Sequence, residues 1–167
     1  MELAVLNTQG QETGRKVVLS DAVFGVEAND HAIYLDVKQF LADQRQGTHK
    51  AKQRNEVAGS TRKLKRLARR SALTYKAQAG AISVIENLQM EAPKTKQVVA
   101  LTEALKVSNK KVLLVLPEGN VNLQLSCRNI PSVKPILAAN INTYEVMNAN
   151  VLVMVEGAEN VLNVMLA

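Results

Sequence analysis

Residues 112–116 read Val-Leu-Leu-Val-Leu and continue directly into Pro117-Glu118-Gly119. Two other short runs, residues 81–85 and 151–155, are apolar apart from Ser83 and show no regular polar alternation. Continuous apolar strands of this kind are typical of parallel sheets that are covered on both faces. The three runs therefore predict the centre of a buried parallel sheet.

Helical patterns separate these runs. Val98, Leu101 and Leu105 lie on one helical face, and further helices are expected within residues 121–130, 142–148 and 156–166, with a shorter strand at 133–137. Alternating strands and helices imply right-handed crossovers and layered packing. We therefore expect an α/β fold with three layers and Rossmann-like topology, built on an open, mostly parallel sheet of about four strands flanked by helices.

The N-terminal half has a different pattern. Residues 2–6 and 15–19 predict a pair of short strands joined by a loop that contains Gly10 and Gly14. Asn29-Asp30 is a plausible helix start, and Gly47 a plausible stop. The apolar residues of that helix would be Ile33, Val37, Phe40 and Leu41.

An irregular segment is expected at residues 48–62, followed by a second helix from about 64 to 79 that ends at Gly80. Its apolar face would contain Leu64, Leu67, Ala68, Ser71, Ala72 and Tyr75, which leaves Lys65, Arg66, Arg69 and Arg70 outside. We predict one globular domain over residues 1–167, with a basic loop region at 45–66.

Composition narrows the class of protein. Apolar residues make up 47% of the 167 residues, enough for a core, but aromatics are only 3%. The single cysteine, Cys127, excludes an intramolecular disulfide and suits a reducing compartment. No secretory signal is visible, and no apolar run approaches the ~20 residues of a membrane helix. We expect a cytoplasmic, monomeric protein that does not enter a membrane.

Charge is concentrated in one stretch. Residues 44–76 contain eleven basic residues and one acid, Glu56, a net of +10, whereas the rest of the chain has ten basic and fourteen acidic residues, a net of −4. Such a concentration of like charge persists best where a polyanion neutralises it. A solvated charged face is the alternative, but the acids that usually balance such a face are absent here. A membrane surface is less suitable, because the stretch has no Trp or Phe to act as an anchor.

The side chains of this stretch suit phosphate and sugar contacts more than base stacking, for which only His49 and Tyr75 are available. We therefore expect binding to folded RNA by shape and backbone, with Arg54 and Arg69 both exposed. The candidate RNA-binding residues are Arg45, Gln46, Thr48, His49, Lys50, Lys52, Arg54, Ser60, Arg62, Lys63, Lys65, Arg66, Arg69 and Arg70.

An enzyme is the natural competitor, since parallel α/β folds often bind nucleotides. The chain contains neither a G-x-G-x-x-G motif nor a Gly-rich loop ending in Lys-Ser or Lys-Thr. Its only histidines are His31 and His49, and Cys127 has no histidine partner visible in the sequence. We expect no catalysis, no metal and no cofactor.

Several segments are similar to one family. The run Arg45-Gln46-Gly47-Thr48-His49-Lys50, continuing to Gly59-Ser60, resembles the signature of bacterial large-subunit ribosomal protein number four. Residues 65–73, 91–96, 126–131 and 142–158 resemble further motifs of that family, so the similarity covers essentially the whole chain. In the family, a few dozen Gly-, Arg- and Lys-rich residues separate the Gly-Ser turn from the Lys-Arg-Leu-Ala segment. Here Thr61-Arg62-Lys63-Leu64 passes almost directly into Lys65-Arg66, so these residues are missing near 62–66.

The resemblance implies a structural role in the ribosome, with large-subunit ribosomal RNA and neighbouring ribosomal proteins as partners and binding early in assembly. The long loop of the family helps to line the peptide exit tunnel, and a chain without that loop is not expected to do so. Some members also bind the messenger leader of their own operon, a role that is not general to the family. A protein-interaction module whose basic stretch meets an acidic partner or chaperone remains the alternative.

Overall fold

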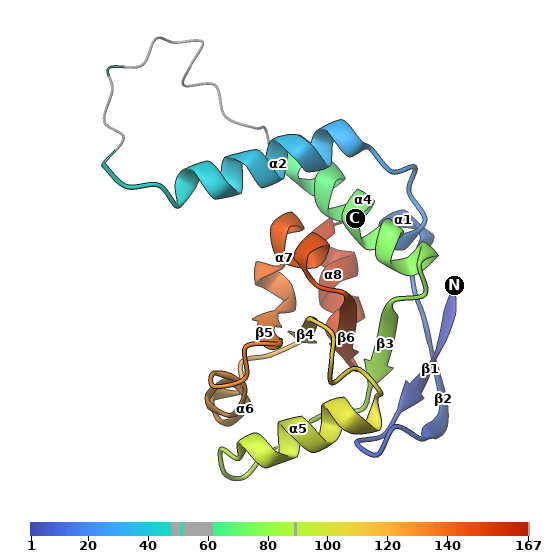
Figure 1. Cartoon of the computed structure of the whole chain (residues 1–167). Coiled ribbons are helices and arrows are strands. Elements are labelled where there is room, and N and C mark those ends of the chain that lie inside the picture. Colours follow the sequence, from blue (N-terminus) through green and yellow to red (C-terminus); the bar gives the residue numbers. More distant parts are fainter. Residues whose placement is uncertain (48–50, 52–61, 89, 167) are drawn as a thin grey trace.

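The computed structural model describes residues 1–47, 51, 62–88 and 90–166. Its centre is one six-stranded sheet with the order β2-β1-β3-β6-β4-β5 (Figure 1). The strands are β1 (Glu2–Leu6), β2 (Glu12–Val18), β3 (Ile82–Ile85), β4 (Val112–Leu116), β5 (Val133–Leu137) and β6 (Val151–Val155). The helices are α1 (Asp21–Phe24), α2 (Asp30–Asp43), α4 (Arg62–Gln78), α5 (Thr95–Ala104), α6 (Val121–Cys127), α7 (Thr143–Asn148) and α8 (Ala158–Leu166), with a 3₁₀ turn η1 (Ala138–Asn140).

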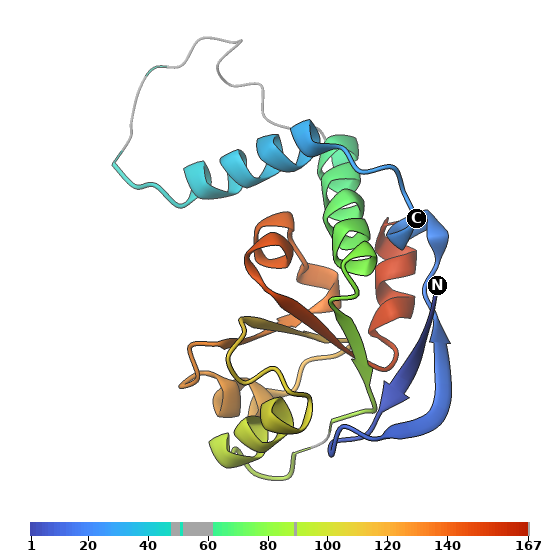
Figure 2. The same ribbon diagram turned by 45° about the vertical axis from the view of Figure 1, so that its right-hand side comes forward.

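The three apolar runs form the buried centre of this sheet. β3, β6 and β4 are neighbours and run parallel, and every residue of β4 and β6 is buried. Leu113 and Val115 point into a core shared with α1, α4, α7 and α8, whereas Leu114 and Leu116 point into a second core under α5 and α6. The predicted fold class is therefore confirmed, with helices on both faces of the sheet (Figure 2).

The N-terminal strand pair belongs to the same sheet. β1 pairs antiparallel with β2 on one side and parallel with β3 on the other. The parallel pairing of β1 with β3 extends the expected sheet of about four strands to six. Sequence alone could not show it, because it joins residues about 80 positions apart, such as Val5 and Val84.

The helices confirm most of the expected positions and correct several boundaries. α2 ends at Asp43, four residues before Gly47, and α4 begins at Arg62, so residues 62–66 of the expected basic loop region are helical. Gly80 follows α4 with a φ of 61°, a left-handed conformation that glycine adopts without steric cost. The short helix α1 was not expected from the sequence.

α2 and α4 lie together at the end of the molecule where the parallel strands begin (Figure 1). α4 leads into β3, and the two helices pack against each other, while α2 also contacts α7. None of the helices in the described part of the chain is both long enough and apolar enough to span a bilayer.

Candidate nucleic-acid interface

α4 carries seven of the 18 lysine and arginine residues that the structure describes, and it contains no acid. It contains no Gly or Pro, and Ala68, Ser71 and Ala72 are buried on it. Six basic residues stand on its first nine positions: Arg62, Lys63, Lys65, Arg66, Arg69 and Arg70. We call these the α4 cations.

The start of α4 is electrostatically unfavourable by itself. Its first turn contains no acidic residue, although the N-terminal end of a helix carries partial positive charge and is stabilised by anions. Cations at Arg62, Lys63 and Lys65 add to that positive potential. An external anion would remove this repulsion and stabilise the helix start.

The α4 cations have no ion-pair partner among the described residues. Elsewhere in the described chain three side-chain cations form ion pairs: Arg15 contacts Glu156 at 2.8 Å, Lys16 contacts Glu2 at 3.3 Å and Lys134 contacts Glu145 at 2.5 Å. Other cations of the described body, such as Lys96 and Lys110, are also unpaired but are scattered, whereas the α4 cations stand within nine successive positions that contain no acid. This density favours an anionic partner at α4 over a solvated charged face.

Exposure divides the α4 cations into two groups. Arg62 and Lys63 are exposed, whereas Lys65, Arg66, Arg69 and Arg70 are half-buried. The Nε atoms of Arg69 and Arg70 are covered and have no hydrogen-bond partner. The expectation that Arg69 is exposed is therefore wrong: α4 packs against α2 and α7, which cover part of its basic face.

A small cavity of about 80 Å³ lies where α2, α4 and α7 meet. Asp36 and Asp43 of α2 line it together with Lys65 and Arg69. Neither acid forms an ion pair with these cations. Instead, the buried carboxylate of Asp36 accepts a hydrogen bond from Thr143 Oγ1 at 2.5 Å.

Two contacts hold α2 and α4 together at the other end of their interface. Tyr75 Oη donates a hydrogen bond to Asp30 Oδ1 at 2.6 Å, and the backbone N–H of Asn29 donates to Ser71 Oγ at 3.1 Å. The hydrogen bond from Tyr75 raises the pKa of its phenol, because it requires the protonated form.

α2 also contacts α7, where Phe40 stacks on Tyr144 with ring centroids 5.0 Å apart. The sequence predicted the Asn29 cap but none of these contacts.

The other candidate residues are divided by position. Arg45 and Gln46 are exposed just beyond α2. Thr48, His49, Lys50, Lys52, Arg54 and Ser60 lie outside the described residues.

Lys76, the last cation of residues 44–76, does not belong to the basic surface formed by the α4 cations. Lys76 Nζ donates to the carbonyl of Ala149 at 2.6 Å, and burial lowers the pKa of its ammonium group. Lys76 therefore supports the turn before β6 and is not part of the basic surface.

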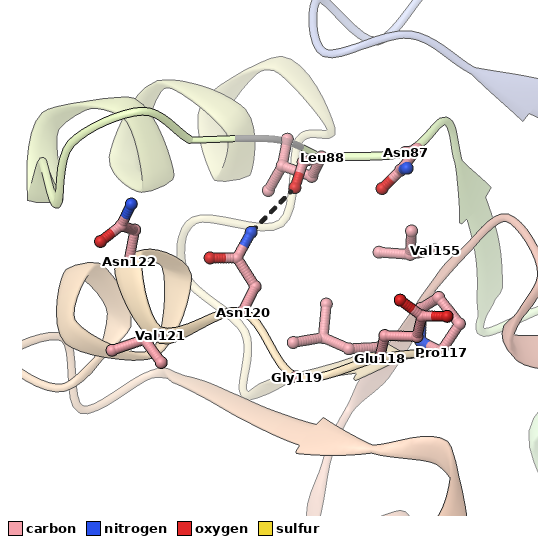
Figure 3. A pocket seen from close by; sticks show the side chains of 10 residues that line it. Asn87, Leu88, Pro117, Glu118, Gly119, Asn120, Val121, Asn122 and Val155 are labelled. Atoms are coloured by element: carbon pink, nitrogen blue, oxygen red, sulfur yellow. Dashed lines mark hydrogen bonds between the residues drawn. The ribbon is translucent and has the colours of Figure 1, made fainter.

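The usual ligand position of a parallel sheet, at the carboxyl ends of its strands, does not contain catalytic groups. A cavity of about 450 Å³ lies there, lined by Asn87, Glu118, Asn120 and Asn122 among others (Figure 3). Asn120 caps α6 and also donates to the carbonyl of Leu88, and Asn122 donates to the carbonyls of Met90 and Glu91. No histidine, cysteine, lysine or arginine lines this cavity within the described residues.

Metal binding has no support in the described part of the chain. Those residues contain no group of three or more His, Cys, Asp or Glu side chains that could hold an ion. Cys127 is buried and unpaired, and desolvation raises the pKa of its thiol to about 11. A thiol with this pKa is protonated near neutral pH and is a poor nucleophile.

Comparison with known proteins identifies relatives over the whole chain. The sequence profile of the Ribosomal protein L4/L1 family matches residues 17–66 and 60–165. The large ribosomal subunit protein uL4 of Phocaeicola vulgatus is 46% identical over 208 aligned positions, covering 98% of this chain and 100% of the relative. The corresponding proteins of Parabacteroides distasonis and Porphyromonas gingivalis are each 47% identical, covering 95% and 98% of this chain and 95% and 98% of the relatives. The 208 aligned positions exceed the 167 residues of this chain by 41, so the relative contains residues that this chain lacks.

Proposed function

We propose, because this chain belongs to the Ribosomal protein L4/L1 family, that it is a structural component of the large ribosomal subunit in the bacterial cytoplasm. The matched relatives are proteins of that subunit, at 46–47% identity over 95% or more of the chain. Family membership also makes the chain a structural protein and not an enzyme. The expectation that it lacks catalytic activity is confirmed on this basis.

The partner in this role is large-subunit ribosomal RNA, bound early in assembly through the α4 cations and Arg45, Gln46 and the basic residues that follow them. The observation that carries this proposal is the concentration of the six α4 cations on nine successive positions that contain no acid, with no ion-pair partner among the described residues. Phosphates supply the missing negative charge. The covered Nε atoms of Arg69 and Arg70 limit how these two residues act, since only the outer guanidinium nitrogens can reach a phosphate.

The protein recognises its RNA by the phosphate backbone and the folded shape of the RNA, and not by stacking on its bases. Tyr75 is the one aromatic side chain of α4, and it is half-buried with its hydroxyl bound to Asp30, so α4 offers little ring surface for base stacking. Every polar side chain on the first nine positions of α4 is an arginine or a lysine, which suit phosphates. If six to eight cations contact phosphates, log K falls with log salt with a slope of roughly −4 to −7.

The family's long loop, most of which this chain lacks, has a role separate from RNA binding by α4. We propose that the positions absent from this chain fall near residues 60–66, where the two matched segments of the family profile meet. The family's long loop helps to line the peptide exit tunnel. This chain keeps the two ends of that loop and, on this proposal, binds RNA without lining the tunnel.

A titration of the full chain with large-subunit ribosomal RNA at several salt concentrations tests the proposal. We expect saturable binding with the salt slope given above. Binding that is absent, or that does not depend on salt, would overturn it.

A protein partner is the second candidate, because an acidic protein or a dedicated chaperone would also neutralise the α4 cations. Native mass spectrometry of the chain purified from its host, with and without nuclease, separates the two. Co-purifying RNA that nuclease removes supports the ribosomal role. A stoichiometric acidic protein without RNA would favour the alternative.

A further inference from the structure

We propose that the edge of the sheet opposite α2 and α4 is a second docking surface, which binds an extended, cation-bearing segment of another protein. This carboxyl edge consists of the loops that follow β1, β3, β6, β4 and β5. Three adjoining hollows lie along it, of about 290, 450 and 250 Å³. Leu88 lines both the first and the second hollow, and Leu116, Gly119 and Asn120 line both the second and the third.

The dimensions of this edge fit an extended chain. The three hollows follow the order of the strands, from Thr8 beside β1, through Val155 at the end of β6, to Leu137 at the end of β5. Five strands spaced about 4.8 Å apart span roughly 19 Å, which an extended peptide covers with about six residues. A compact small molecule would fill only one of the hollows.

Four exposed amide side chains line this edge. Asn87, Gln97, Gln124 and Asn140 each line one of the hollows. None of them forms a side-chain hydrogen bond with the described residues. An amide group offers both donors and an acceptor, as a peptide backbone does. Four such groups along the edge could pair with the N–H and C=O groups of an extended segment.

The charge of the edge indicates a cation in that segment. Each of the three central strands is followed by a glutamate: Glu86 after β3, Glu156 after β6 and Glu118 after β4. Arg15 of β2 reaches the first two, at 3.7 Å from Glu86 and 2.8 Å from Glu156. Glu118 lines the central hollow (Figure 3) and has no such partner among the described residues. A lysine or arginine of the docked segment would pair with Glu118 as Arg15 pairs with the other two.

A nucleotide or RNA fits this edge poorly. No lysine, arginine or histidine lines any of the three hollows within the described residues. Glu118 would repel a phosphate, and its loop supplies a single glycine, Gly119, in place of a Gly-rich phosphate-binding loop. The two ends of the molecule therefore suit different partners, a polyanion at α4 and a basic polypeptide at the carboxyl edge.

The test uses ¹⁵N-labelled full chain titrated with an acetylated, amidated hexapeptide of alternating lysine and threonine. We expect the side-chain amide signals of Asn87, Gln124 and Asn140 to shift together and to saturate. Glu118→Lys should weaken this binding at least threefold, and Asn87→Ala combined with Gln124→Ala should weaken it further. Glu103→Lys is the matched control, because Glu103 is exposed on α5 and lines none of the hollows; it should leave the affinity unchanged.

The second arm of the test distinguishes the partners. A hexapeptide of alternating glutamate and threonine should leave the edge signals unchanged, since Glu118 repels it. The proposal is overturned if the lysine peptide shifts none of the edge signals, or if Glu103→Lys weakens binding as much as Glu118→Lys does. It is also overturned if ribosomal RNA, and not the lysine peptide, shifts the edge signals. None of these results affects the RNA-binding proposal for α4, which the salt titration tests separately.

Discussion

Tyr75 on α4 donates a hydrogen bond of 2.6 Å to Asp30 at the start of α2, and so joins two residues that are 45 positions apart in the chain. The segment between them carries most of the basic stretch. This contact, together with the bond from Asn29 to Ser71, fixes the ends of α2 and α4 on the body side of their interface. The contact therefore helps to fix how α2 and α4 lie relative to each other.

The Tyr75–Asp30 contact predicts an alkaline dependence of stability. The pKa of Tyr75 is raised above its ordinary value of 10.0 by the bond to Asp30, so the contact contributes stability below about pH 10 that is lost as pH rises through the folded-state pKa. Tyr75→Phe should therefore melt at a lower temperature than the parent at pH 8, and the difference should shrink above pH 10. Thermal unfolding of both proteins across pH 7–11 measures this. A difference that grows with pH would contradict it.

The exposed pair Arg62 and Lys63 should contribute to RNA binding without contributing to folding. Changing both to Glu should weaken binding roughly tenfold or more and reduce the salt slope by about 2, because two phosphate contacts are lost. The free energy of unfolding should not fall and should rise by about 0.3–1 kcal/mol for each substitution, because both side chains are exposed and a glutamate in the first turn of α4 interacts favourably with the positive end of the helix. Filter binding at four salt concentrations and urea unfolding measure the two effects.

Lys96→Glu with Lys110→Glu is the matched control for that double variant. It makes the same change in net charge at two exposed lysines on or after α5, away from α4. Its RNA affinity should fall much less. An equal loss of affinity would show that net charge, and not the position of the α4 cations, determines binding.

Lys76 should behave differently from the other cations of the stretch. Its ammonium is bound to the carbonyl of Ala149 and is partly desolvated. Lys76→Met keeps most of the aliphatic stem and removes the charge, so we expect RNA affinity within about twofold of the parent, less than the effect of one lost phosphate contact. A tenfold loss of affinity would place Lys76 on the RNA surface after all.

The sequence predicted the sheet well because its strands are local, continuous apolar runs, such as residues 112–116 and 151–155. It could not show that Val5 lies beside Val84, because that pairing depends on how two distant segments meet. At the candidate site, too, the sequence could not show contacts between segments that are distant in the chain. Charge density located the α4 cations, but Arg69 and Lys76 are partly covered by α7 and by the turn before β6, and neither neighbour is close in sequence.

The same reasoning explains which groups the sequence missed on the carboxyl edge. Asn87 and Glu118 follow two different strands, and nothing in their sequence spacing places them beside one cavity. Only the strand order, in which β6 separates β3 from β4, brings them together. Topology is therefore the main information that the structure adds to the residue pattern.

The buried Asp36–Thr143 bond should stabilise the junction of α2 and α7. Thr143→Val keeps the shape of the side chain but leaves the Asp36 carboxylate without its donor, in a site where Asp36 is 8% exposed. We expect a loss of about 1–3 kcal/mol in the free energy of unfolding, measured with urea. In an Asp36→Asn background the loss should be smaller, because an unpaired amide costs less than an unpaired carboxylate. Equal losses in both backgrounds would show that the two side chains do not interact.

Cys127 offers a test of the core under α6 that requires no substitution. Its side chain is 1% exposed, and desolvation raises the pKa of the thiol to about 11 from 9.0. The buried neutral thiol therefore favours the folded state below about pH 9, and this contribution is lost between about pH 9 and 11. At pH 8 an aromatic disulfide reagent should label the native chain only as fast as the protein opens, and adding urea should accelerate labelling in parallel with global unfolding. Rapid labelling of the native chain without urea would show that α6 opens locally, so that this core is less stable than its burial implies.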